Sequence, residues 1–175
     1  MELLDGRQLA KDVRAEIAAE VEKLKTAGGR APHLAAVLVG ADPASEVYVR
    51  NKVRSCEKVG FQSTLVRRPA DITQAELLGI VAELNQDDDI DGFIVQLPLP
   101  DHIDEEAVTL AIDPRKDVDG FHPVNFGRMA QGLPCYLPAT PFGIMEILRR
   151  YDIETEGKEV VIVGRSNIVG TPMSI

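Results

Sequence analysis

Apolar residues recur along the chain in two patterns, one with helical spacing and one made of short continuous runs. Leu9, Val13, Ile17, Val21 and Leu24 follow one another at steps of four, four, four and three, which is the spacing of a helix with one face toward a core. The same pattern predicts further helices over 42–60, 71–85, 104–112, 141–150 and the last few residues. Strands are predicted over 33–40, 61–68, 90–100 and 157–164.

This alternation of strands and helices predicts an α/β fold. Right-handed crossovers would give a mostly parallel sheet with helices on both faces, a three-layer arrangement. Pro98 must end the third strand because proline donates no ladder hydrogen bond. We expect a first, catalytic domain over 1–140, and over 141–175 a linker helix with the first strand, turn and helix of a Rossmann-like nucleotide-binding domain. That second domain would be incomplete, since a mononucleotide-binding half needs at least one more strand and crossover.

The segment 113–140 is long, rich in Gly and Pro, and without strong periodicity. Loops of this length in compact domains are usually functional or disordered. We therefore expect no regular element there and look for binding residues in it.

Composition narrows the class of protein. The 175 residues are 45% hydrophobic and 27% charged, as expected of a soluble globular chain. The longest apolar runs are far shorter than the ~20 residues of a membrane span, and the N-terminus has no apolar leader core, so we expect a cytoplasmic protein. Cys56 and Cys135 have no disulfide or zinc spacing. A net charge of −9 without a basic patch argues against nucleic acid but leaves small anionic ligands open.

The helix 42–60 carries the first candidate site. On a helical wheel Val49, Val53 and Cys56 form the buried stripe, and Lys52 lies at its flank beside Ser45 and Tyr48. Partial burial would lower the pKa of the lysine toward neutrality, which suits proton transfer. The alternative is a lysine that covers apolar surface with its stem and keeps its ammonium in water.

Two more candidates follow predicted strands or turns. Gln96 comes at the carboxyl end of a predicted parallel strand, the edge where open α/β sheets bind ligands, although polar residues at strand ends are commonly just hydrated. Asp119 precedes Gly120 in the stretch KDVDGF, where it could form a turn or accept two hydrogen bonds from a planar amino-heterocycle. His33, His102 and His122 lack metal-ligand spacing, so we expect no metal.

A glycine-rich turn follows the last predicted strand. In VVIVGRSNIVG, Gly164 and Gly170 open a helix, but Ser166 stands at the second glycine position and the last glycine comes one residue late. Arg165 could meet a phosphate, and the helix start offers N–H donors. Taken alone, this is a weak dinucleotide-binding signal.

Five stretches together resemble one family. Ser45-x-x-Tyr48-x-x-x-Lys52, DGFIVQLPLP, KDVDGFHPVNFGRM, LPATPFGIMEIL and GKEVVIVGRSNIVGTPM match, in order and spacing, the bifunctional methylenetetrahydrofolate dehydrogenase/methenyltetrahydrofolate cyclohydrolase family. The resemblance implies oxidation of 5,10-methylenetetrahydrofolate with NADP, NAD being the less favoured cofactor, and hydrolysis of the methenyl product to 10-formyltetrahydrofolate. It also implies one folate cleft between two α/β domains and a homodimer for full-length members.

The resemblance further implies a role for each matching residue. Lys52 would be the essential catalytic lysine, Gln96 the amide that positions and tunes it, Tyr48 the ring that packs on folate, and Asp119 the anchor of the pterin. Ser45, Leu97 and Pro98 would complete the substrate-binding set. The cofactor loop would be Gly164, Arg165, Ser166, Ile168 and Gly170.

The family chain continues for on the order of another 100 residues. The alternative prediction is therefore a folate-binding fragment without dehydrogenase activity. Short-chain dehydrogenases also use Tyr-x-x-x-Lys, but their glycine-rich loop precedes that pair, whereas here it follows, so this class is rejected.

Overall fold

The computed structural model describes residues 3–175. Its helices and strands follow one another in the order α1 (Gly6–Thr26), β1 (His33–Val39), α2 (Pro43–Val59), β2 (Gln62–Arg68), α3 (Gln74–Gln86), β3 (Gly92–Val95), α4 (Glu105–Ala111), α5 (Pro123–Ala130), α6 (Ala139–Arg150) and α7 (Gly170–Met173). Within these residues, no helix has the combination of length and apolar composition that a membrane crossing requires.

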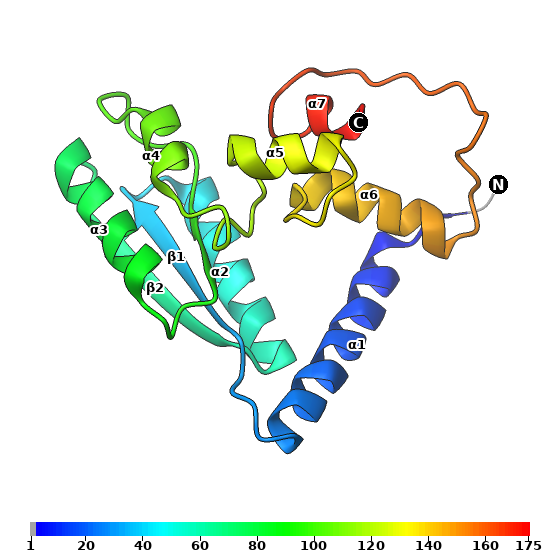
Figure 1. Ribbon diagram of the computed structural model, residues 1–175, viewed down its shortest axis with the longest axis horizontal. Coiled ribbons are helices and arrows are strands. Elements are labelled where there is room, and N and C mark those ends of the chain that lie inside the picture. Colours follow the sequence, from blue (N-terminus) through cyan, green and yellow to red (C-terminus); the bar gives the residue numbers. More distant parts are fainter. Residues whose placement is uncertain (1–2) are drawn as a thin grey trace.

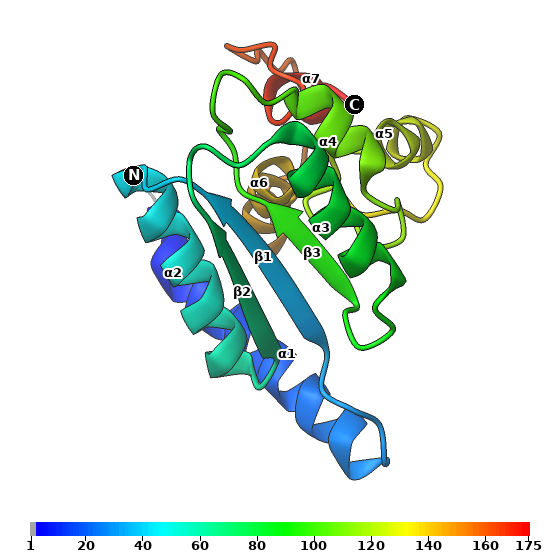
Figure 2. The ribbon, with the colours of Figure 1, turned by 90° about the vertical axis from the view of Figure 1, so that its left-hand side faces the viewer.

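Three parallel strands form the sheet, in the order β2-β1-β3. β1 pairs with β2 from His33↔Gln62 to Val39↔Arg68, and with β3 from Leu34↔Gly92 to Val37↔Val95. Figures 1 and 2 show α2 on one face of the sheet and α3 on the other. The predicted three-layer α/β arrangement is thus confirmed for the first part of the chain.

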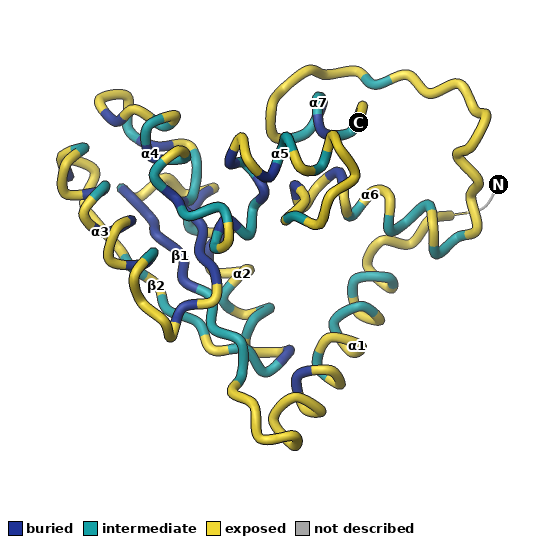
Figure 3. The backbone as a smooth tube through the Cα atoms, in the orientation of Figure 1, coloured by how far each residue is buried: buried dark blue, intermediate teal, exposed yellow. Residues whose placement is uncertain are grey.

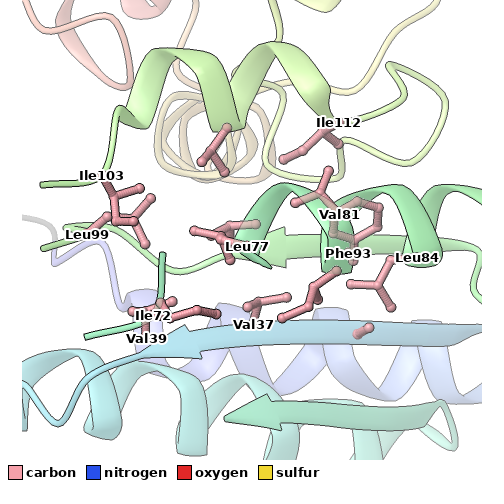
Figure 4. Packing of buried hydrophobic residues seen from close by; sticks show 14 of the residues in the cluster. Val37, Val39, Ile72, Leu77, Val81, Leu84, Phe93, Leu99, Ile103 and Ile112 are labelled. Atoms are coloured by element: carbon pink, nitrogen blue, oxygen red, sulfur yellow. The ribbon is translucent and has the colours of Figure 1, made fainter. Parts of the chain in front are cut away.

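The core lies on both faces of β1, which is buried along most of its length (Figure 3). Ala35, Val37 and Val39 point into the larger cluster under α3 and α4, shown in Figure 4, while Ala36 and Leu38 pack against α2. Because successive side chains of a strand face opposite sides, a strand in the middle of a three-layer fold must be apolar at every position. The continuous apolar run of the sequence reflects this central place.

Helix starts follow local capping chemistry. Asp42 accepts a hydrogen bond from the backbone N–H of Ser45 at 2.7 Å, and Pro43 occupies the first turn of α2, as the sequence predicted. α3 begins at Gln74 rather than at residue 71, because Thr73 and Glu76 form a reciprocal capping box there.

The prediction that 113–140 holds no regular element was wrong. α5 forms because the His122 ring accepts a hydrogen bond from the N–H of Val124 at 3.1 Å and Pro123 fills the first helical position. α6 also begins earlier than predicted, at Ala139.

The strand predicted over 157–164 does not form. Val161 is 86% exposed and Val163 98% exposed, and no strand pairs with this segment among the described residues. Figure 1 shows it crossing open space between α6 and α7. A strand needs neighbours for its N–H and C=O groups and for its apolar side chains, and residues 3–175 supply none at this place.

α6 is tied to the amino-terminal half of α1. Arg150 donates from both terminal nitrogens to the Glu16 carboxylate at 2.6 Å, and the hydroxyl of Tyr151 accepts from the N–H of Asp5 at 2.8 Å. The carboxyl-terminal half of α1 instead lies against α2, where Val21 is buried. α1 thus joins α6 to the sheet domain.

Candidate functional site

α2 presents the three polar residues of the first candidate site to different environments. Ser45 is buried at 3% exposure, Tyr48 is 62% exposed, and the Lys52 side chain keeps 43% of its accessible surface. Val49 is fully buried beneath them. More than half of the Lys52 side chain is therefore covered, and the rest is accessible to solvent.

Lys52 and Asp119 meet across a shallow groove. The Lys52 Nζ lies 3.7 Å from Oδ1 of Asp119, and both residues line a mostly apolar pocket of about 300 Å³. Its walls come from α2, β1, the start of β2, β3 and residues 118–119. The chain therefore brings together a cation and a carboxylate over an apolar floor, an arrangement suited to a flat, partly polar ligand.

Asp119 sits in a tight turn. The N–H of Gly120 donates to the carbonyl of Asp117 at 3.1 Å, and Gly120 has φ +69°. A Cβ at Gly120 would lie 2.8 Å from the carbonyl oxygen of Tyr136 and from the carbonyl carbon of Leu137. Only glycine fits this close approach without strain, so the turn is fixed against the segment that leads into α6.

The turn is closed by a buried polar network that the sequence analysis did not assign. The Asp117 carboxylate is 2% exposed and accepts hydrogen bonds from the N–H of Phe121 at 3.2 Å, the N–H of His122 at 2.9 Å and the side-chain amide of Asn125 at 2.8 Å. Asn125 also donates to the carbonyl of Pro114 at 2.9 Å. The sequence offered one signal, since Asp117 is the first aspartate of KDVDGF. Its hydrogen-bond donors cannot be identified from the sequence, because they are brought to it only by the turn and by α5.

Burial governs the acidity of Asp119. Removal from water raises the pKa of its carboxyl above the ordinary value, the nearby Asp117 carboxylate raises it further, and the Lys52 ammonium opposes both. Burial and the neighbouring carboxylate thus favour the protonated form of Asp119 more than water does, while Lys52 favours the charged form.

Gln96 follows β3 and is held by its own neighbour. Its Nε2 donates to the carbonyl of Leu97 at 2.6 Å, while its Oε1 is buried without a hydrogen-bond partner. Leu97 is half-buried and Pro98 exposed. A buried acceptor without a donor is costly, and a ligand or a moving side chain could satisfy it.

The predicted site residues are only partly assembled. Lys52 and Asp119 line one pocket, and Ser45 and Tyr48 are not among its lining residues. Within residues 3–175, no hydrogen bond or ion pair joins Lys52 to Ser45, Tyr48 or Gln96. Their roles in binding remain predictions.

The predicted cofactor residues form a compact turn. Ser166 Oγ accepts from the N–H of Val169 at 3.2 Å and of Gly170 at 3.4 Å, and a Cβ on Gly170 would collide with the backbone of Gly164 and Arg165. Arg165 and Ile168 are exposed. The turn is thus formed, but residues 3–175 form no strand next to it that would support it.

The histidines and cysteines have structural surroundings. His102 contacts the carbonyl of Ile72 at 2.9 Å, and His33 contacts the hydroxyl of Thr64 at 2.8 Å. Both cysteines are free and half-buried, and burial raises the pKa of the Cys56 thiol. In the part of the chain that the structure describes, no three His, Cys, Asp or Glu side chains gather as a metal site.

Two family models match the chain. The tetrahydrofolate dehydrogenase/cyclohydrolase catalytic domain matches residues 4–119, and the NAD(P)-binding domain of the same family matches residues 138–175. The catalytic-domain match ends at Asp119, the residue that faces Lys52. The second match begins just before α6.

Similar proteins carry the same description. The bifunctional protein FolD of Flavobacterium johnsoniae is 62% identical over 175 residues, which cover all of this chain and 59% of that protein. The bifunctional FolD enzyme of Campylobacter jejuni is 46% identical with a TM-score of 0.96, over 99% of this chain and 61% of that one. The Trypanosoma brucei enzyme, solved with NADP and an inhibitor, is 38% identical with a TM-score of 0.92, over 97% of this chain and 58% of that one.

This chain therefore spans about three fifths of the length of the relatives it matches. The catalytic-domain model covers more than half of its residues. The chain belongs to the tetrahydrofolate dehydrogenase/cyclohydrolase family.

Proposed function

We propose that this chain carries the folate-binding half-site of a methylenetetrahydrofolate dehydrogenase and methenyltetrahydrofolate cyclohydrolase. The observation that carries the proposal is the meeting of Lys52 and Asp119, 3.7 Å apart over an apolar pocket. In this proposal Asp119 binds the amino-pyrimidine edge of the pterin, and Tyr48, exposed on α2 four residues before Lys52, packs on the folate. Ser45, Leu97 and Pro98 complete the surface.

Lys52 is the proposed proton relay for hydrolysis. Water adds to the methenyl carbon and loses one proton, which leaves a hydroxyl on that carbon. The hydroxyl then loses its proton as the bond from the carbon to N5 breaks and N5 takes up a proton, so that 10-formyltetrahydrofolate forms and one proton is released overall. A bound folate would cover the accessible side of Lys52 and place its amine beside the reacting carbon, where a positioned lysine can move protons. The unsatisfied Oε1 of Gln96 is the proposed acceptor that holds this amine.

NADP is the proposed cofactor of the oxidation, and when bound it takes a hydride from the methylene carbon. Gly164, Arg165, Ser166, Ile168 and Gly170 would meet its phosphates, with Arg165 suited to the additional phosphate that distinguishes NADP from NAD. Their turn is formed, but the exposed segment 158–164 has no partner strand among the described residues. Firm cofactor binding would require strands that residues 3–175 do not supply.

This observation favours a second candidate function, folate binding and hydrolysis without dehydrogenase activity. We place the division between the two parts of the chain near residue 140, close to where the second family match and α6 both begin. In the cell, the one-carbon product would serve purine, methionine and histidine biosynthesis.

Incubating the chain with methenyltetrahydrofolate tests the proposal. Loss of the methenyl absorbance above the uncatalysed rate supports hydrolysis. Binding without this loss supports a folate-binding role alone. If the chain neither binds nor hydrolyses methenyltetrahydrofolate, the proposal is refuted. A parallel NADP titration should show no tight binding. Methylene-dependent NADPH formation would instead contradict the restricted second candidate.

A further inference from the structure

The Asp117 carboxylate is buried without a cation. It is 2% exposed, and none of the ion pairs formed within residues 3–175 includes it. Its three donors, the N–H groups of Phe121 and His122 and the amide of Asn125, are all neutral. Burying a charged group costs free energy. The presence of a buried carboxylate with three donors directed at it therefore needs a structural explanation.

The donors converge from the far side of the turn that carries Asp119. Asp117 forms a β-bridge with Phe93 of β3, and residues 118–120 then turn away from the sheet. After this turn the chain comes back to Asp117, and the N–H groups of residues 121 and 122 donate to its carboxylate. Asn125 reaches the same carboxylate from the first turn of α5 and binds the carbonyl of Pro114 with the same amide. The network therefore clamps both ends of the turn.

We propose that Asp117 and Asn125 are positioning residues for Asp119: their buried hydrogen bond holds the 117–122 turn closed and so keeps the Asp119 carboxylate within reach of Lys52 and of the pterin. This inference rests on the proposed folate site for its functional part. Its structural part, the dependence of Asp119 on Asn125, stands independently of any ligand.

Asn125→Ala is the sharpest variant because it removes the clamp without changing any charge. Lys52 on α2 and Asp117 in the same loop are the charged groups that face Asp119, and both remain. Asn85→Ala is the matched control, since Asn85 also makes two bridging hydrogen bonds, to the carbonyl of Ala111 and from the N–H of Asp113, and neither is made to a residue of the 117–122 turn.

The first measurement is the titration of the Asp119 carboxyl carbon by NMR, assigned by its loss in Asp119→Asn. In Asn125→Ala the turn opens and water reaches the carboxyl, so the midpoint should fall toward that of an ordinary aspartate, whereas Asn85→Ala should leave it unchanged. An unchanged midpoint in folded Asn125→Ala would overturn the inference. If that variant does not fold, Asn125→Leu, which keeps the size of the side chain and also lacks a donor, provides the same test.

The second measurement is affinity for 5-formyltetrahydrofolate by calorimetry. The Asn125→Ala variant should bind the ligand about tenfold more weakly, as expected when one positioned hydrogen bond is lost. In a chain that already carries Asp119→Ala, adding Asn125→Ala should lower the affinity hardly any further. Additive losses would contradict positioning through Asp119. If the unmodified chain binds no folate, the proposed function fails while the NMR titration still decides whether Asn125 positions Asp119.

Discussion

Lys52 Nζ lies 3.7 Å from Oδ1 of Asp119, and the two side chains line one pocket. Lys52 stands on α2, which packs on one face of the sheet, and Asp119 stands on a glycine-dependent turn beyond β3. With 43% of the lysine side chain accessible, such a pair contributes little to stability. Its value lies in placing two opposite charges at one ligand surface.

Replacing Lys52 by methionine should abolish hydrolysis of methenyltetrahydrofolate. The substitution keeps the apolar stem and removes the amine, so a loss on the order of 10²–10⁴-fold is expected for a positioned proton relay, with unchanged circular dichroism. The rate is followed by the methenyl absorbance. Lys58→Met, on an exposed position of the same helix, is the control, and comparable turnover in Lys52→Met would disprove the assignment.

Asp119→Asn should make the protein more stable at neutral pH. Because burial raises the pKa of Asp119 above its ordinary 3.8, the folded state favours the neutral carboxyl, and the stability that this gives is lost as the pH rises through the folded value. Asparagine carries no such charge. Melting temperatures should therefore be higher for Asp119→Asn than for the unmodified chain at pH 7 and equal at pH 3.

A lower melting temperature of Asp119→Asn at pH 7 would show that the ion pair with Lys52 outweighs the burial of the carboxylate. The opposite and expected result would identify Asp119 as a residue kept at a cost to stability, as is common at functional sites.

Gly120→Ala should destabilise the chain by about 1–3 kcal/mol, since a side chain at positive φ and a close contact both cost energy. The Cβ would lie 2.8 Å from the backbone of Tyr136 and Leu137. Gly132→Ala is the matched control, because its φ of +67° is similar but nothing lies within 4 Å of its Cβ. Denaturant unfolding of both variants separates the contact from the backbone strain, and equal losses would argue against a tightly packed turn.

Val163→Glu should change the free energy of unfolding by less than about 0.5 kcal/mol, as is usual for an exposed site. Val163 is 98% exposed on the segment that forms no strand. Val37→Glu, at a fully buried position of β1, should prevent folding. A large loss at Val163 would mean that this segment is paired in solution.

The elements that the sequence predicted well are those decided by nearby residues. Asp42 and Pro43 set the start of α2, and the apolar run of β1 shows its central place in the sheet. The strand over 157–164 was wrong because a strand depends on partners elsewhere in the chain. α5 was missed because the signal lay in a histidine cap and not in periodicity.

The candidate site shows the same division. Lys52 and Asp119 could be singled out from their motifs, and the structure places them together. The exposure of Lys52 could not be predicted, since it depends on which elements cover α2. The role of Asp117 was equally hidden, because its donors come from the chain returning after the turn.

The tie between Arg150 and Glu16 also bears on how the chain folds as it leaves the ribosome. The carboxyl-terminal half of α1 gains its partner when α2 is made, but the half that carries Leu9 and Val13 must wait until α6 has emerged. Until α6 is made, this amphipathic half-helix has no tertiary partner among the described residues. It therefore stays open to chaperones until α6 has emerged, and only then joins its native partner.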